Sequence, residues 1–167
     1  MEIDGLGAFR PRGGGYQFFP AAGPKVFIAY AHEDAAAAER LYAAFRSHGI
    51  VPWLDRMKLL PGQNWPRAIE RAIEVSDFVV ACLSRQSLRK RGQFQAELRC
   101  ALDCARRVPQ DDTYLLPVRL EECAVPPQIS REIQYVDLFP DWEQGVRRVV
   151  KAIRLQVKAR SELRPTG

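Results

Sequence analysis

The chain has 167 residues and a mass of 19.0 kDa, and its 47% hydrophobic and 27% charged residues are ordinary for one soluble globular domain. That length leaves no room for two independent cores. No apolar run reaches the roughly 18 residues of a membrane span, and the first residues lack the pattern of a secretory signal. We therefore expect a single cytoplasmic domain that is neither secreted nor membrane-spanning.

The net charge of +5 and the pI of about 9.2 come from one end of the chain. Between residues 146 and 167, seven basic residues stand against the single acidic Glu162, so the rest of the chain is near neutral: Arg147, Arg148, Lys151, Arg154, Lys158, Arg160 and Arg164. Apolar residues recur at helical spacing from Trp142 to Val157, which predicts that the basic residues up to Lys158 line the solvent face of a helix. The charge is thus a weak indication of nucleic acid as a partner.

Residues 1–24 differ in composition from the rest of the chain, because they hold six glycines and three prolines. This composition predicts a flexible leader, although its four aromatic residues would also suit packing on the domain or on a neighbouring subunit. The organised domain is expected at 25–158, followed by a basic tail at 159–167. The four cysteines are expected to be reduced thiols.

From Lys25 onward, short apolar runs alternate with segments of helical periodicity. The runs predict strands at 26–30, 50–54, 78–83, 114–118 and 134–138, with Pro117 indicating a sheet edge or strand end. Helices are expected from Glu33 to a cap at Gly49, from about Trp65 with Ile69, Ala72 and Ile73 buried, at 92–106, and at 141–158. Residues 85–91 are expected to form a basic loop, and Trp53 to fill the core. This alternation predicts an α/β fold, a flavodoxin-like three-layer sandwich with a five-stranded parallel sheet.

Several common chemistries have no support in the sequence. The segments after the predicted strands lack both G-x-G-x-x-G and G-x-x-x-x-G-K, so a Rossmann or P-loop nucleotide site is disfavoured. There is no G-x-S-x-G motif, and His32 and His48 are the only histidines. Cys100 and Cys104 lie one helical turn apart without a second ligand pair, so we expect core residues and no metal site.

One carboxylate stands out on the helix predicted at 92–106. At about 100° per residue, Glu97 lies at the edge of the apolar face that contains Phe94 and Leu98. A carboxylate there would be partly desolvated and would face the cleft left by the strand ends. From spacing alone, a solvated helix face is the favoured explanation of Glu97.

Five sequence blocks appear in an order that resembles Toll/interleukin receptor (TIR) domains, especially bacterial ones. They are Lys25–Asp34, Trp53–Asp55, Leu59–Trp65, Ser76–Ser84 and Gln93–Leu98. The resemblance extends from about Lys25 to Leu155 and implies the same flavodoxin-like fold that the strand and helix order predicts.

The resemblance also implies a function. Many TIR domains cleave NAD, and their essential glutamate matches Glu97. By the same resemblance, the substrate cleft is bordered by Tyr30, Ala31, His32, Asp55, Lys58, Leu59, Gln93 and Phe94. The loop 55–62 would also contact neighbouring TIR subunits in a homo-oligomer. NAD would be a substrate, with no separate cofactor, and a sensor protein or nucleotide signal would trigger activity in bacterial antiphage defence or virulence.

One departure keeps other functions open. Several active TIR enzymes have tryptophan four residues before the glutamate, where this chain has Gln93. A non-enzymatic TIR adaptor that acts through protein contacts is therefore an alternative. A nucleoside deoxyribosyltransferase-like enzyme would share the fold and a catalytic glutamate, but the pattern from Asp55 to Trp65 argues against it.

Overall fold

The computed structural model describes residues 23–54, 65–89, 91–109 and 112–163, together with the backbone of three N-terminal strands. These strands are β1 (Glu2–Ile3), β2 (Gly7–Arg12) and β3 (Gly15–Pro20), and they pair antiparallel in the order β1-β2-β3. The segment for which the sequence predicts a flexible leader thus contains paired strands. Its aromatic residues, which favour strands, agree with this pairing.

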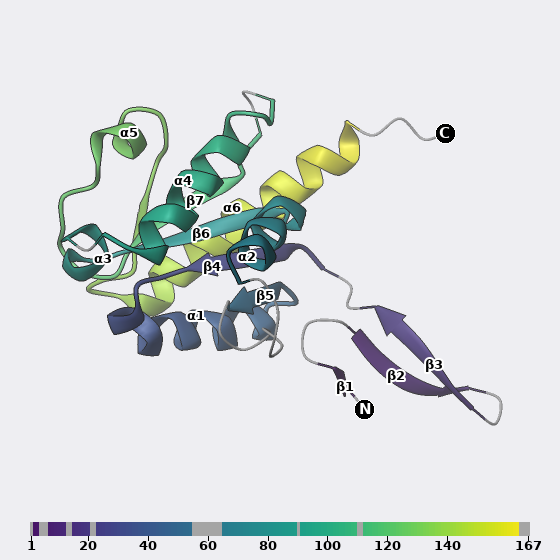
Figure 1. Cartoon of the computed structure of the whole chain (residues 1–167). Helices are drawn as coiled ribbons and strands as arrows, with labels where there is room; N and C mark the ends of the chain where they lie inside the picture. The colour runs from purple at the N-terminus through teal and green to yellow at the C-terminus, as the bar shows by residue number, and fades with distance from the viewer. Residues whose placement is uncertain are drawn as a thin grey trace.

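The domain is built on a five-stranded parallel sheet in the order β5-β4-β6-β7-β8 (Figure 1). The strands are β4 (Lys25–Ala29), β5 (Val51–Leu54), β6 (Phe78–Leu83), β7 (Leu115–Arg119) and β8 (Val136–Asp137). The chain runs from β4 out to the edge strand β5 and then returns to β6 on the other side of β4. This reversal makes the carboxyl ends of β4 and β6 the switch point of the sheet.

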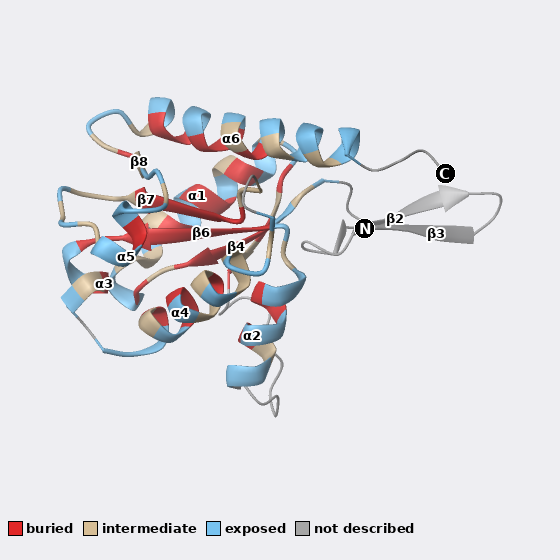
Figure 2. Cartoon of the chain, turned by 90° about the horizontal axis from the view of Figure 1, so that it is seen from above, coloured by how far each residue is buried: buried red, intermediate tan, exposed pale blue. Residues whose placement is uncertain are grey.

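Helices cover both faces of the sheet, as a parallel sheet requires. They are the 3₁₀ turn η1 (His32–Asp34) and α1 (Ala35–Ser47), α2 (Trp65–Val75), α3 (Arg85–Arg89), α4 (Gln93–Ala105), α5 (Pro127–Ser130) and α6 (Trp142–Glu162). Figure 2 shows α1 and α6 on one face and α2 and α4 on the other. The predicted three-layer α/β sandwich is confirmed. Within the described residues, no helix combines the length and apolar character needed to cross a membrane.

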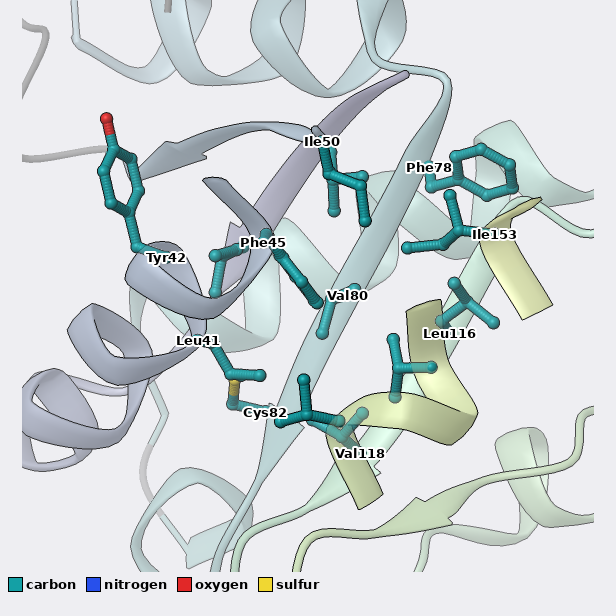
Figure 3. Close-up of a cluster of buried hydrophobic side chains, with 14 of the residues drawn as sticks. Leu41, Tyr42, Phe45, Ile50, Phe78, Val80, Cys82, Leu116, Val118 and Ile153 are labelled. Carbon is teal, nitrogen blue, oxygen red and sulfur yellow. The ribbon is translucent and has the colours of Figure 1, made fainter. Parts of the chain in front are cut away.

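Each face of the sheet has its own hydrophobic core. Strand β6 contributes to both, because Val80 and Cys82 point toward α1 and α6 whereas Val79 and Ala81 point toward α2 and α4. Figure 3 shows the first core, which contains Phe45 of α1, Ile153 of α6 and Val80 of β6. The second contains Phe27 of β4, the predicted α2 residues Ile69, Ala72 and Ile73, and Phe94 and Leu98 of α4. All six residues of β6 are buried, which explains its continuous apolar run.

The cap predicted at Gly49 is present. Gly49 has a φ of +74°, its N–H donates to the Arg46 carbonyl, and the Ile50 N–H donates to the Phe45 carbonyl. These two bonds are those of a Schellman motif, which turns the chain from α1 directly into β5.

Two segments depart from the sequence prediction. Residues 85–89 form helix α3 rather than a loop, because Ser84 and Ser87 exchange backbone-to-hydroxyl hydrogen bonds of 2.8 and 3.0 Å in the manner of a capping box. Helix α6 continues to Glu162, so residues 159–162 are not a tail. Arg160 holds this last turn, since its guanidinium donates to Asp112 at 2.6 Å and lies 4.5 Å from the centre of the Phe78 ring.

Pro117 lies in an inner strand and not at the edge of the sheet. Strand β8 pairs with β7 only at Val118 and Arg119. The backbone nitrogen of Pro117, which has no hydrogen to donate, therefore faces no neighbouring strand. The short pairing is reinforced by Arg119, which donates two hydrogen bonds of 2.6 and 2.8 Å to the Asp137 carboxylate. The hydrogen bond from Arg119 lowers the pKa of Asp137.

This pair gives a pH-dependent prediction. Because the folded pKa of Asp137 is depressed, its contribution to stability is complete at neutral pH and is lost as the pH falls through that value. We expect Asp137→Asn to lower the free energy of unfolding by about 1–3 kcal/mol at pH 7. The deficit should shrink below about pH 4. Urea unfolding at pH 7 and below about pH 4 measures the loss of stability. Asp103→Asn, which removes a carboxylate from an exposed ion pair, is the control and should change stability little. A pH-independent deficit would contradict the role of the charge.

Gly145 permits α6 to approach β8 closely. A Cβ atom at this position would lie 2.6 Å from the Asp137 carbonyl oxygen and 2.9 Å from the Leu138 Cα. We expect Gly145→Ala to cost about 2–3 kcal/mol through this overlap with backbone. Gly49→Ala, which meets open space but keeps a positive φ, should cost about 1 kcal/mol. Chemical denaturation of both variants checks this order, and equal losses would refute the packing argument.

Candidate functional site

The carboxyl ends of the parallel strands form the edge where ligands bind in sheets of this kind. At this edge Ser84, directly after β6, donates a hydrogen bond of 2.6 Å to Asp34 of η1. Burial raises the pKa of Asp34, the Ser84 hydrogen bond opposes that shift, and the nearby Glu121 and Glu33 carboxylates add to it. Glu121, after β7, accepts the Arg85 N–H at 2.8 Å. These contacts join the segments that follow β4, β6 and β7.

A cleft of about 620 Å³ lies beside these contacts. Its lining includes Glu33, Asp34, Ser84, Arg89 and Glu121, together with the first turn of α1. Glu97 is not among the lining residues, because α4 covers the opposite face of the sheet from α1. The sequence-predicted carboxylate therefore lies outside this cleft.

Glu97 lies in the second turn of α4 and is deeply buried. Its exposed fraction is 3%, and among the residues whose burial is described it is the single buried charged side chain. The Nε2 of Gln93, one helical turn earlier, donates a hydrogen bond of 2.9 Å to Glu97 Oε1. A buried carboxylate is costly unless hydrogen bonds compensate it, so Gln93 helps to hold the group in place.

The neighbours of Glu97 fix the position of α4 on the sheet. Phe94 and Leu98 are buried in the same cluster as Ala29, at the end of β4. The Nε2 of Gln95 donates to the Ser87 carbonyl at 2.9 Å and so fastens the start of α4 to α3. Helix α2 packs beside α4 (Figure 2), and Glu97 is buried more deeply than the partial desolvation that the sequence predicts.

The other sequence-predicted site residues are distributed around β4 and α4. Ala31, two residues after β4, is 7% exposed, and His32 is exposed at the start of η1. The Tyr30 side chain packs, partly buried, on the core formed with α1 and α6, across the sheet from Glu97. Gln93 and Phe94 flank Glu97 as described. The remaining predicted residues, Asp55, Lys58 and Leu59, lie outside the described residues.

Trp53 in β5 combines core packing with an unmet polar group. Its ring meets that of Phe27 edge to face, with the centroids 5.5 Å apart, as expected for a core residue. Its indole Nε1 is buried, and no acceptor is within hydrogen-bond distance among the described residues. Leaving such a donor unsatisfied costs about 1–3 kcal/mol. Sequence reasoning missed this feature, since the orientation of a ring depends on its three-dimensional neighbours.

The cysteines form no disulfide and no metal centre within the described structure. All four are free thiols, and Cys100 and Cys104 are half-buried on α4. Burial and the neighbouring Cys104 raise the pKa of Cys100 to about 11, so this thiol is protonated at neutral pH. Over the described ranges, no three His, Cys, Asp or Glu side chains gather in a way that would hold a metal ion.

Comparison with known proteins identifies a family. A family model described as a TIR domain matches residues 26–150, about three quarters of the chain. An uncharacterized protein of Sinorhizobium fredii NGR234, y4cD, is 24% identical over 115 residues. The match spans 69% of this chain but 18% of that protein, so the chain corresponds to a small part of this relative.

Solved structures show the same fold at low sequence identity. The TIR domain of the Toll-related receptor TRR-2 from Hydra magnipapillata has a TM-score of 0.60 and 20% identity, over 75% of this chain and 97% of that one. A TIR-STING receptor from C. gigas, solved with 2′,3′-cGAMP, has a TM-score of 0.64 and 23% identity. That match spans 77% of this chain and 38% of the receptor chain.

Proposed function

Because this chain belongs to the TIR domain family, we propose that it is an NAD glycohydrolase whose catalytic residue is Glu97. One observation carries the proposal. The carboxylate that matches the essential glutamate of NAD-cleaving TIR domains is also the single buried charged side chain among residues of described burial. A stable fold has no need of a charge there, because burying it opposes folding.

The proposed reaction breaks the bond between C1′ of the ribose and the nicotinamide nitrogen. The bonding electron pair leaves with the ring, which turns the cationic nicotinamide into a neutral leaving group and requires no general acid. The ribose becomes an oxocarbenium-like cation. Water then adds at C1′ and loses a proton to give ADP-ribose, or a nucleophile of the adenine moiety adds to give a cyclic product.

Glu97 would stabilise the positive charge that develops on the sugar. A carboxylate acts more strongly on a nearby charge when protein rather than water surrounds both groups. Its burial at 3% exposure supplies that environment. Gln93 restrains the carboxylate through its 2.9 Å hydrogen bond and so limits reorganisation during the reaction. This is the electrostatic part of glycosidase catalysis.

Replacing Glu97 tests the assignment directly. We expect Glu97→Gln to reduce nicotinamide release by at least about 100-fold, because the shape is kept while the negative charge is lost. The glutamine oxygen still accepts from Gln93, so the melting temperature should not fall. Chromatography of NAD incubated with concentrated protein measures the products. Asp103→Asn, an exposed carboxylate on the same helix, is the matched control. Undiminished release by Glu97→Gln would rule out its catalytic role.

Gln93 should act by positioning the carboxylate. We expect Gln93→Leu, which keeps the side-chain size but removes the donor, to lower kcat about ten-fold while KM changes little, and to lower the melting temperature because the buried carboxylate loses a hydrogen bond. Steady-state kinetics and thermal unfolding separate these quantities. A variant with wild-type kcat would show that the hydrogen bond to Glu97 is incidental to turnover.

Activity of TIR enzymes is commonly tied to assembly, and we propose that this chain works as a cytoplasmic homo-oligomer in bacterial antiphage defence or virulence. The contacts would include the 55–62 loop, which lies outside the described residues. A separate sensor protein or a nucleotide signal would supply the trigger. The NAD assay is therefore performed on assembled as well as dilute protein.

The alternative function is that of a non-enzymatic TIR adaptor. It is favoured by Gln93, which stands where several active family members have tryptophan. An adaptor would leave NAD intact even when assembled, so the same incubation distinguishes the two functions. A nucleoside deoxyribosyltransferase-like activity would instead appear as exchange of a base on a deoxynucleoside.

A further inference from the structure

The buried indole N–H of Trp53 lies on the same side of the sheet as Glu97. In the parallel register Trp53 of β5 pairs with Phe27 of β4, and the two rings meet at an interplanar angle of 83°. Trp53 packs against the core that contains Phe94 and Leu98, the neighbours of Glu97 on α4. It is the penultimate residue of β5, so it stands close to the carboxyl edge at which ligands enter such sheets.

The indole nitrogen itself has no structural use in the described molecule. Its Nε1 is fully covered, and within the described residues no acceptor is in range. The surrounding core is apolar. A phenylalanine would fill much of the same space and make a similar edge contact with Phe27, without an unsatisfied donor. The indole N–H therefore lacks an acceptor among the described residues, and a bound ligand could provide one.

We propose that Trp53 is a substrate-binding residue, whose indole N–H donates a hydrogen bond to an oxygen of the bound dinucleotide. The inference rests on the proposed NAD cleavage. An indole N–H is a donor only, so its partner must be an acceptor such as a ribose hydroxyl, carboxamide or phosphate oxygen. Because Nε1 is covered in the unliganded molecule, the substrate has to displace part of this cover on binding.

The matched substitutions are Trp53→Phe and Trp142→Phe. Trp53→Phe removes the N–H and keeps an aromatic ring against Phe27. Trp142 is a suitable control because it begins α6, on the other face of the sheet, and stacks on Arg40 at 4.3 Å. We expect Trp53→Phe to raise KM for NAD about ten-fold, with kcat within about two-fold and no loss of melting temperature. Trp142→Phe should leave KM unchanged.

The kinetic outcomes separate this inference from the proposed function. If the protein cleaves NAD through Glu97 but Trp53→Phe leaves KM unchanged, the proposed function stands and the role of Trp53 is overturned. An increase in KM that accompanies a lowered melting temperature would also overturn it, because that result indicates disturbed packing. Absence of any Glu97-dependent cleavage by assembled protein would remove the proposed function and this inference with it.

A binding measurement tests the hydrogen bond without turnover. The measurement uses ¹⁵N-labelled protein that carries Glu97→Gln, so that NAD binds without being cleaved. The indole resonance of Trp53 is the one that disappears when Trp53→Phe is added to this variant. Titration with NAD should shift this resonance and slow its exchange with solvent, while that of Trp142 stays in place. No change at Trp53 when NAD is saturating would overturn the proposal.

Discussion

The complete burial of β6 constrains the rest of this structure. A parallel strand with apolar residues on both faces requires a helical layer on each side, and crossover helices place every strand end at the same edge. All six β6 residues are buried, and its neighbours β4 and β7 pair with it along most of their length. The position of α4, and with it that of Glu97, follows from covering one face of this strand.

The two layers of the molecule differ in their buried polar groups. The core beneath α1 and α6 consists of apolar and aromatic side chains, with the Cys82 thiol and the Tyr42 phenol, and contains no charged group among the described residues. The layer of α2 and α4 contains the Glu97 carboxylate and the indole donor of Trp53. Both groups oppose folding. The Glu97 carboxylate loses its hydration, and the Trp53 indole N–H lacks an acceptor. Groups that lower the stability of the fold are typical of functional sites, where the chemistry requires them.

Local pattern was enough to predict the elements that form the sheet and its main helices. Strand 78–83 and the buried residues of α2 follow from periodicity, and Gly49 ends α1 because a left-handed residue is needed there. The Ser-x-x-Ser exchange that begins α3 was also readable in the sequence, although four basic residues in 85–91 suggested a loop. The pairing of Arg119 with Asp137 was not readable, because β7 and β8 become neighbours only in the folded sheet.

The candidate site shows the same limit. Helical spacing placed Glu97 at the edge of an apolar face, but its depth of burial depends on tertiary packing that spacing along one helix does not reveal. For Tyr30, the alternation along β4 sends the side chain to the opposite face, so proximity in sequence to the strand end does not bring it to Glu97. Helical spacing drew attention to Glu97 but left a solvated helix face as the favoured explanation, and the resemblance to TIR domains is what selected it as catalytic from among twenty acidic residues.

The net charge has little bearing on this site. The exposed residues Arg147, Lys151 and Arg154 line the outer face of α6, across the sheet from α4 (Figure 2). They face solvent on the far side of the sheet from Glu97, where salt screens exposed charges. Arg160, which the sequence assigned to a basic tail, is paired with Asp112 instead. The charge that matters at Glu97 is therefore its own buried carboxylate, while the basic face of α6 lies across the sheet and is available to a different partner.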